Sequence, residues 1–272
     1  MNPVETTTDP FVKFKEMQRQ SWTRFAPLAT FTTPPAAKLV KHARIKSGQR
    51  VLDVGCGTGP VAVTAARRGA KVTGLDLTPE LLEHAKENSK VAEVEVEWRQ
   101  GDAEALPFED ATFDVVVSQF GHIFAPRPEV AVKEMLRVLK PGGAIAFSTW
   151  PPELVIGRCM LLTGQYLPKP PVEIPPPSLW GDPNIVRERL GNAVKDLEFD
   201  RDDMFIPALS PQHYRAMMEQ TAGPVLKVVE TLREKDPAAL ERFRRESDAI
   251  LAEYTEDNLI AQSFLMTRAT KA

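Results

Sequence analysis

The stretch VLDVGCGTG, residues 51–59, ends a short apolar run in glycines at alternate positions. Gly55 and Gly57 permit left-handed backbone and let a ligand approach the chain with no Cβ in the way. Asp53 stands two residues before Gly55, where its carboxylate can accept hydrogen bonds from the loop or from an amine. Such a combination is typical of a nucleotide-binding loop after the first strand of a parallel sheet.

Two further carboxylates follow apolar runs, at distances along the chain from the glycine loop that suit ligand binding. Asp76 lies twenty-one positions after Gly55, the reach that suits an acid binding a pair of ribose hydroxyls. Asp102 and Ala103 follow the next expected strand, so this carboxylate can accept from an exocyclic amine such as that of adenine. No Walker lysine or arginine cluster accompanies the loop to bind phosphates. The residues therefore predict a site for an adenosine whose tail is positive rather than negative.

A nicotinamide-dependent oxidoreductase is the main alternative for this loop. Its dinucleotide fingerprint needs a third glycine where this sequence has Pro60, and Asp102 also argues against it. Asp76 does not distinguish a nicotinamide cofactor from an adenosine with a positive tail, because an acid can bind the ribose of either one. A third interpretation is a non-catalytic protein that has kept a nucleotide site.

The segments around the loop alternate between strand and helix from Arg50 onward. RVLDVG, AKVTGLDL, FDVVVSQF and GAIAFSTW are expected strands, and helical periodicity lies between them. This alternation predicts an α/β fold with a Rossmann-like sheet and helices on both faces. We expect seven mostly parallel strands, an N-terminal helical extension and a lid insertion after the fifth strand.

Composition divides the chain into four expected regions. Residues 1–47 are an N-terminal helical extension, and residues 48–150 form the nucleotide-binding core. Residues 151–191 are rich in proline but also apolar, which predicts a lid rather than a bare linker. Residues 192–272 are expected to complete the sheet and the substrate cover.

The overall charge and composition argue against several kinds of partner. The net charge is −3, and Lys and Arg are spread along the chain, so no basic surface predicts nucleic acid. No apolar run is long enough to span a bilayer, the first residues lack the apolar core of a signal peptide, and only two cysteines occur. We expect a cytoplasmic protein without a metal site; the oligomeric state is left open.

Four segments together make the chain similar to a known family. VLDVGCGTG, GLDLTPELLEHAKE, GDAEALPFEDATFDVVVSQF and RVLKPGGAIAFSTW resemble, in order and spacing, four motifs of the class I S-adenosylmethionine-dependent methyltransferases. The resemblance covers residues 48–150 and is nearest to the small-molecule group that includes the ubiquinone and menaquinone C-methyltransferases. It implies S-adenosylmethionine as cofactor and methyl transfer to a small molecule.

The resemblance also implies which residues hold the cofactor. Asp53 organises the loop and the cofactor's amino group, Asp76 holds the ribose hydroxyls, and Asp102 accepts from the adenine amine. Leu77 packs on the adenine, although it can equally be a core residue, just as Asp53 can merely cap the loop. The full implied set is Asp53, Gly55, Cys56, Gly57, Asp76, Leu77, Asp102, Ala103, Ser118 and Gln119.

Methyl transfer from a sulfonium is an in-line displacement with a neutral leaving group, so alignment is the main requirement. His122, after the fourth expected strand, is the candidate base if the acceptor carries a proton; a packed core histidine is the alternative. Trp150, Tyr166 and Trp180 are the candidate substrate-binding residues, unless they only attach the lid to the core. The apolar content of the lid predicts a small, partly apolar methyl acceptor, with the acceptor atom undecided.

Overall fold

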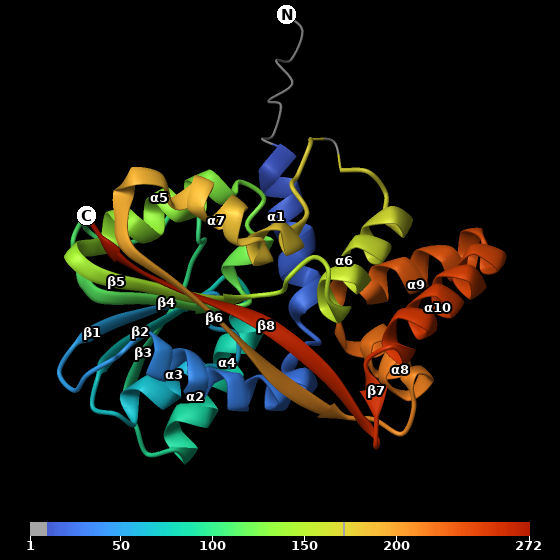
Figure 1. Ribbon diagram of the computed structural model, residues 1–272, viewed down its shortest axis with the longest axis horizontal. Coiled ribbons are helices and arrows are strands. Elements are labelled where there is room, and N and C mark those ends of the chain that lie inside the picture. The colour runs from blue at the N-terminus through green and yellow to red at the C-terminus, as the bar shows by residue number, and fades with distance from the viewer. Residues whose placement is uncertain (1–9, 171) are drawn as a thin grey trace, which may run out of the picture.

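The computed structural model describes residues 10–170 and 172–272, and a sheet of eight strands lies at its centre (Figure 1). The strand order is β3-β2-β1-β4-β5-β8-β6, with β7 (Thr255–Glu256) pairing with β8 outside this path. The predicted fold class is confirmed, with one strand more than expected because the two-residue β7 joins the sheet.

The first five strands are parallel wherever they pair. They are β1 (Arg50–Val54), β2 (Lys71–Asp76), β3 (Val96–Gln100), β4 (Phe113–Gln119) and β5 (Leu139–Thr149). β8 (Leu259–Lys271) lies between β5 and β6 (Val194–Pro207) and is antiparallel to both. The carboxyl ends of the parallel strands consequently share one edge of the sheet.

Alternate residues of the central strands enter two separate cores, because successive side chains of a strand point to opposite faces. Val51 belongs to one core and Leu52 to the other, and all of β1 after Arg50 is buried. In Figure 1, one face of the sheet is covered by α2, α3 and α4 and the other by α5 and α7. Their bounds are α2 (Thr33–His42), α3 (Pro60–Ala66), α4 (Pro79–Val91), α5 (Pro128–Val138) and α7 (Pro183–Leu190).

A second group of helices stands beside the sheet (Figure 1) and has a small apolar core of its own, which includes Val228 and Phe243. Ion pairs link two of these helices: Glu219 pairs with Arg215 on its own helix and with Arg244 on the other. The group consists of α6 (Val155–Tyr166), α8 (Pro211–Thr221), α9 (Gly223–Lys235) and α10 (Pro237–Ala252), and α1 (Pro10–Trp22) contacts α9.

Proline opens most of the described helices, where its missing N–H costs no hydrogen bond. Asp182, Ser210 and Asp236 add side-chain caps to α7, α8 and α10. Short 3₁₀ turns complete the connections: η1 (Ala26–Thr32), η2 (His122–Phe124), η3 (Pro177–Gly181) and η4 (Gly191–Ala193). Within the described ranges, no helix has both the length and the apolar character needed to cross a membrane.

Candidate active site

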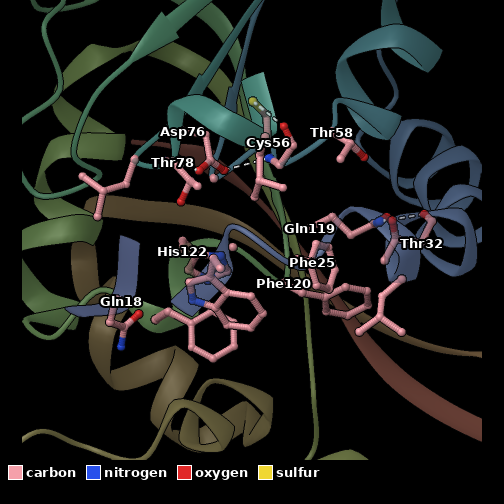
Figure 2. A pocket seen from close by; sticks show the side chains of 18 of the residues that line it. Gln18, Phe25, Thr32, Cys56, Thr58, Asp76, Thr78, Gln119, Phe120 and His122 are labelled. Atoms are coloured by element: carbon pink, nitrogen blue, oxygen red, sulfur yellow. Dashed lines mark hydrogen bonds between the residues drawn. The ribbon is translucent and has the colours of Figure 1, made fainter. Parts of the chain in front are cut away.

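A cavity lies at the shared carboxyl edge of β1, β2 and β4 and continues toward α6 and α8. Figure 2 shows Asp76 and Cys56 on one side of it, with Gln119, Phe120 and His122 below and beside them. Apart from Ser118, every residue that the sequence predicts to hold the cofactor lines this cavity. These residues are brought together by the sheet; their contacts with a cofactor stay predictions.

Glycines in the loop after β1 serve two different needs. Gly55 has a φ of +66°, and a Cβ there would lie 2.8 Å from the Cα of Gly121, so close packing of two backbones requires glycine. Gly57 has a φ of +55°, and a Cβ there would meet no atom within 4 Å. Gly57 therefore leaves space at the cavity wall, whereas Gly55 lets the loop pack on the chain that follows β4.

Asp53 is buried at the base of this loop, with 1% of its surface exposed. Its Oδ2 accepts a hydrogen bond from the N–H of Ala62 at 3.0 Å, and its Oδ1 has no partner in the described part of the chain. Burial, reinforced by the nearby carboxylate of Asp76, raises the pKa of Asp53 to about 7. An unpartnered carboxylate oxygen beside the cavity fits a cationic ligand group such as an ammonium.

Asp76 ties the end of β2 to the glycine loop. Its Oδ2 accepts from the N–H of Gly57 at 2.7 Å and its Oδ1 accepts from the N–H of Thr78 at 2.9 Å. Burial raises the pKa of this carboxyl, while the N–H donors oppose the shift. Asp76 also lines the cavity, and a carboxylate oxygen can accept more than one hydrogen bond, so this residue can in addition accept from ligand hydroxyls.

The carboxylate of Asp102 is engaged by the N-terminal helix. The Nζ of Lys15 on α1 lies 2.6 Å from Asp102 Oδ2 and 2.5 Å from Glu104 Oε2. Gln18 and Trp22 of α1 also line the cavity, so this helix covers the end that is expected to hold the adenine. No motif in the sequence singles out these α1 residues, because their role depends on where the helix docks.

Ser118 and Gln119 end β4 but differ in their surroundings. The hydroxyl of Ser118 is buried below the cavity, donates to the carbonyl of Val54 at 2.6 Å and accepts from the N–H of His122 at 3.1 Å. Gln119 lines the cavity and donates through Nε2 to the carbonyl of Thr32 at 2.8 Å (Figure 2). Its buried Oε1 has no partner among the described residues. Ser118 therefore positions the backbone, and Gln119 ties the cavity wall to η1 through Thr32.

His122 borders the cavity, but its ring is enclosed by aromatic side chains. The ring centroid lies 4.7 Å from that of Phe147 and 4.6 Å from that of Trp180. Neither ring nitrogen has a hydrogen-bond partner in the described ranges. Burial, aided by the positive charge of Arg189, lowers the pKa of His122 to about 3. This imidazole is therefore neutral at physiological pH and a weak base.

The three aromatic residues expected to contact the substrate do not lie together. Trp150 lines the cavity, but Tyr166 and Trp180 do not. Tyr166 packs on Phe243 and donates its hydroxyl hydrogen to Glu246, and Trp180 is a core residue beneath η2 with 1% of its surface exposed. Membership of the proline-rich segment does not determine which face of that segment a side chain occupies.

Phe120 is a cavity residue that sequence reasoning missed. Its ring stacks on Trp150 with centroids 3.9 Å apart and an interplanar angle of 12°. Its φ of +60° is left-handed, a strained conformation for a bulky side chain. The sequence carries no signal for this conformation, which directs the ring along the cavity wall.

One part of the cavity, which we call the apolar chamber, has a mostly apolar wall. It is lined by Phe25, Phe120, Trp150, Met160, Ile206 and Met218, together with the polar residues Tyr214 and Gln262. The charged residues that line the cavity belong to α1, to β1 and β2 and to the loop after β3, and within the described ranges none lines the chamber. The site thus has a charged end and a neutral end.

Comparisons with known proteins show what the sequence and the fold of this chain are similar to. A family model described as a methyltransferase domain matches residues 52–147. An uncharacterized protein of Mycobacterium tuberculosis is 32% identical over 257 residues, which is 93% of this chain and 93% of that protein. Demethylmenaquinone methyltransferase of Staphylococcus aureus is 40% identical over 128 residues, 45% of this chain and 52% of its own. The crystal structure of the YcgJ protein of Bacillus subtilis covers 87% of this chain and 97% of its own, with a TM-score of 0.57 and 20% identity; that likeness concerns the fold alone.

Proposed function

The chain belongs to the class I S-adenosylmethionine-dependent methyltransferases, and from this premise we propose that it methylates a small, partly apolar molecule bound in the apolar chamber. The observation that carries the proposal is the continuity of one cavity from the loop after β1 to this chamber. A methyl donor at the charged end and an acceptor at the neutral end would then meet near Gln119 and Phe120.

The residues of the charged end fit S-adenosylmethionine. The free oxygen of Asp53 suits the ammonium of the methionine part, and Asp76 has acceptor capacity for the ribose. Asp102 can accept from the adenine amine only if it shares its carboxylate with Lys15 or releases that lysine. When bound, the cofactor supplies an electrophilic methyl group on a sulfonium.

The contribution of the chain to the reaction is alignment and exclusion of water. Stacked Phe120 and Trp150 offer a flat wall against which an apolar acceptor can be held. His122 contributes packing rather than proton abstraction, because its nitrogens are enclosed and its pKa is about 3. The geometry therefore favours an acceptor atom that attacks without help from a side-chain base.

Two measurements test this proposal. In calorimetric titration we expect S-adenosylmethionine to bind and NAD not to bind. With a radiolabelled methyl group on the cofactor and a total metabolite extract, we expect label in material that partitions into organic solvent at neutral pH. Label that stays entirely in charged, water-soluble products contradicts the proposed acceptor class.

A matched pair of variants links the label to this site. Asp76→Asn replaces a carboxyl group of the cavity with an amide and is expected to reduce label transfer. Asp110→Asn changes an exposed carboxylate that does not line the cavity, and the rate should not change. Equal rates in both variants would place the cofactor elsewhere.

A further inference from the structure

A buried polar pair interrupts the apolar chamber. Tyr214 on α8 is 5% exposed, and Gln262 on β8 is 2% exposed. The Nε2 of Gln262 donates to the hydroxyl oxygen of Tyr214 at 2.8 Å, and both residues line the cavity. A buried polar pair in an apolar wall costs desolvation free energy, which a bound polar group can offset.

The topology of the sheet places this pair beyond the strand ends. Leu265 of β8 is the residue that pairs with Thr149, the last residue of β5. Because β8 runs antiparallel to β5, its earlier residue Gln262 lies on a stretch that continues past this edge and pairs with β6 at Met204. The pair therefore belongs to the wall of the chamber beyond the carboxyl edge of the sheet.

The pair retains a hydrogen-bond donor whichever way the amide is turned. If Gln262 donates to Tyr214, the hydrogen of the tyrosine hydroxyl remains free to donate. No acceptor for this hydrogen is found within residues 10–170 and 172–272. If the amide is reversed and accepts from Tyr214, the two N–H hydrogens of Gln262 remain instead. Burial raises the pKa of Tyr214, so its hydroxyl keeps its hydrogen at physiological pH.

The rest of the apolar chamber excludes a charged partner for this donor. Among the described residues, no Lys, Arg, Asp or Glu lines the chamber, and His122 at its border is neutral. An ionised substrate group would lose its hydration without gaining a counter-charge. An uncharged oxygen can satisfy the donor at a much smaller desolvation cost.

We propose that Tyr214 and Gln262 form a specificity site that binds a neutral carbonyl or hydroxyl oxygen of an otherwise apolar methyl acceptor. This inference rests on the proposed function and adds the class of substrate group that the chamber selects. Tyr214 and Gln262 act on substrate binding; neither is placed at the methyl group.

Three probes of similar shape test the specificity site in protein saturated with S-adenosylhomocysteine: 2-acetylnaphthalene, 2-isopropenylnaphthalene and 2-naphthoate. The first carries a neutral carbonyl, the second replaces its oxygen with carbon, and the third is charged. We expect the ketone to bind about tenfold more tightly than the hydrocarbon, since one buried hydrogen bond separates them, and the naphthoate to bind most weakly. Dissociation constants come from calorimetry.

Variants assign the preference to the pair. Tyr214→Phe and Gln262→Met approximately keep the volume of the side chains, and the double variant, which removes both possible donors, is expected to reduce the ratio of the two affinities to about two or less. Tyr254→Phe removes a hydroxyl outside the cavity, which accepts from Arg158, and should keep the ratio of the wild-type protein. If the double variant does not fold, the two single variants decide, and we expect at least one of them to reduce the ratio.

Several outcomes overturn the inference: equal affinities for ketone and hydrocarbon, tightest binding of the naphthoate, or no binding of any probe. A preference that survives the double variant, or both single variants where the double variant does not fold, overturns it as well. Titration of S-adenosylmethionine into the same proteins separates this failure from failure of the proposed function. Retained cofactor binding with no ketone preference refutes the specificity site alone. Absence of cofactor binding in the wild-type protein refutes the proposed function.

Discussion

Replacing Asp53 with asparagine should stabilise the cofactor-free protein at high pH while weakening cofactor binding. Asp53 is fully buried, one of its oxygens is unpartnered within the described ranges, and burial raises its pKa from 3.8 to about 7. Because the folded-state pKa is raised, the favourable contribution to stability is present below the unfolded pKa and is lost as the pH rises through 7. Above that pH the ionised carboxylate costs on the order of 4 kcal/mol of folding free energy.

The pH dependence of the stability difference provides the test. Asparagine does not ionise, so the stability of Asp53→Asn relative to wild type should increase by about 2–3 kcal/mol between about pH 5 and about pH 8. The buried amide of the variant adds an offset that does not change with pH. Urea unfolding of cofactor-free protein at both pH values measures the difference, and Asp110→Asn at an exposed site should show no comparable increase.

The same variant should bind S-adenosylmethionine more weakly by about 1.5–3 kcal/mol, because the ammonium loses a charged hydrogen-bond acceptor. Calorimetric titration near neutral pH measures the loss. A stability difference that is constant with pH would refute the argument that Asp53 is ionised at a cost. Unchanged cofactor affinity would refute its assignment to the ammonium.

Four further predictions follow from the same contacts. Asp76→Ala should weaken cofactor binding by about 1.5–3 kcal/mol in calorimetry, because a buried acceptor is lost; unchanged affinity would exclude it from the site. Lys15→Met should speed hydrogen exchange in α1, because the ion pairs that hold this helix to the loop after β3 are lost; unaltered exchange would show that α1 is held by apolar contacts alone. Gly55→Ala should lower the free energy of unfolding by more than about 2 kcal/mol, since its Cβ meets Gly121 at 2.8 Å, and stability within about 0.5 kcal/mol of wild type would argue against that approach. At saturating cofactor and acceptor, kcat should lack an inflection from His122 between about pH 6 and about pH 8, and a histidine-like inflection that disappears in His122→Asn would restore this residue as the base.

The carboxylates at the charged end were predictable because their placement follows from a general rule of parallel sheets. Asp53 lies within β1, Asp76 ends β2, and Asp102 follows β3. Strands of this kind end at a common edge, so their positions along the chain predict their proximity in space. The partner of Asp102 was not predictable, because Lys15 lies 87 positions away and meets it only through the docking of α1.

The substrate side of the site was less accessible to sequence reasoning. Trp150, at the end of the core, and Tyr166 and Trp180, in the proline-rich segment, were all predicted to contact the substrate, yet only Trp150 lines the cavity. Which face of α6 or η3 is turned inward depends on packing against the sheet and α10, and periodicity alone does not specify these partners. Phe120 likewise has a left-handed backbone conformation next to Gly121, which packs on Gly55, and no local pattern in the sequence predicts that contact.

The sequence by itself determined the Rossmann-like α/β fold and the family, because strand and helix periodicity, loop glycines and the spacing of acids are local properties of the chain. The chemical character of the apolar chamber was decided only by tertiary structure. Tyr214 and Gln262 are 48 positions apart and meet because β8 inserts antiparallel beside β5 and α8 packs across it. Such contacts depend on how distant elements dock, and a local pattern carries no record of that geometry.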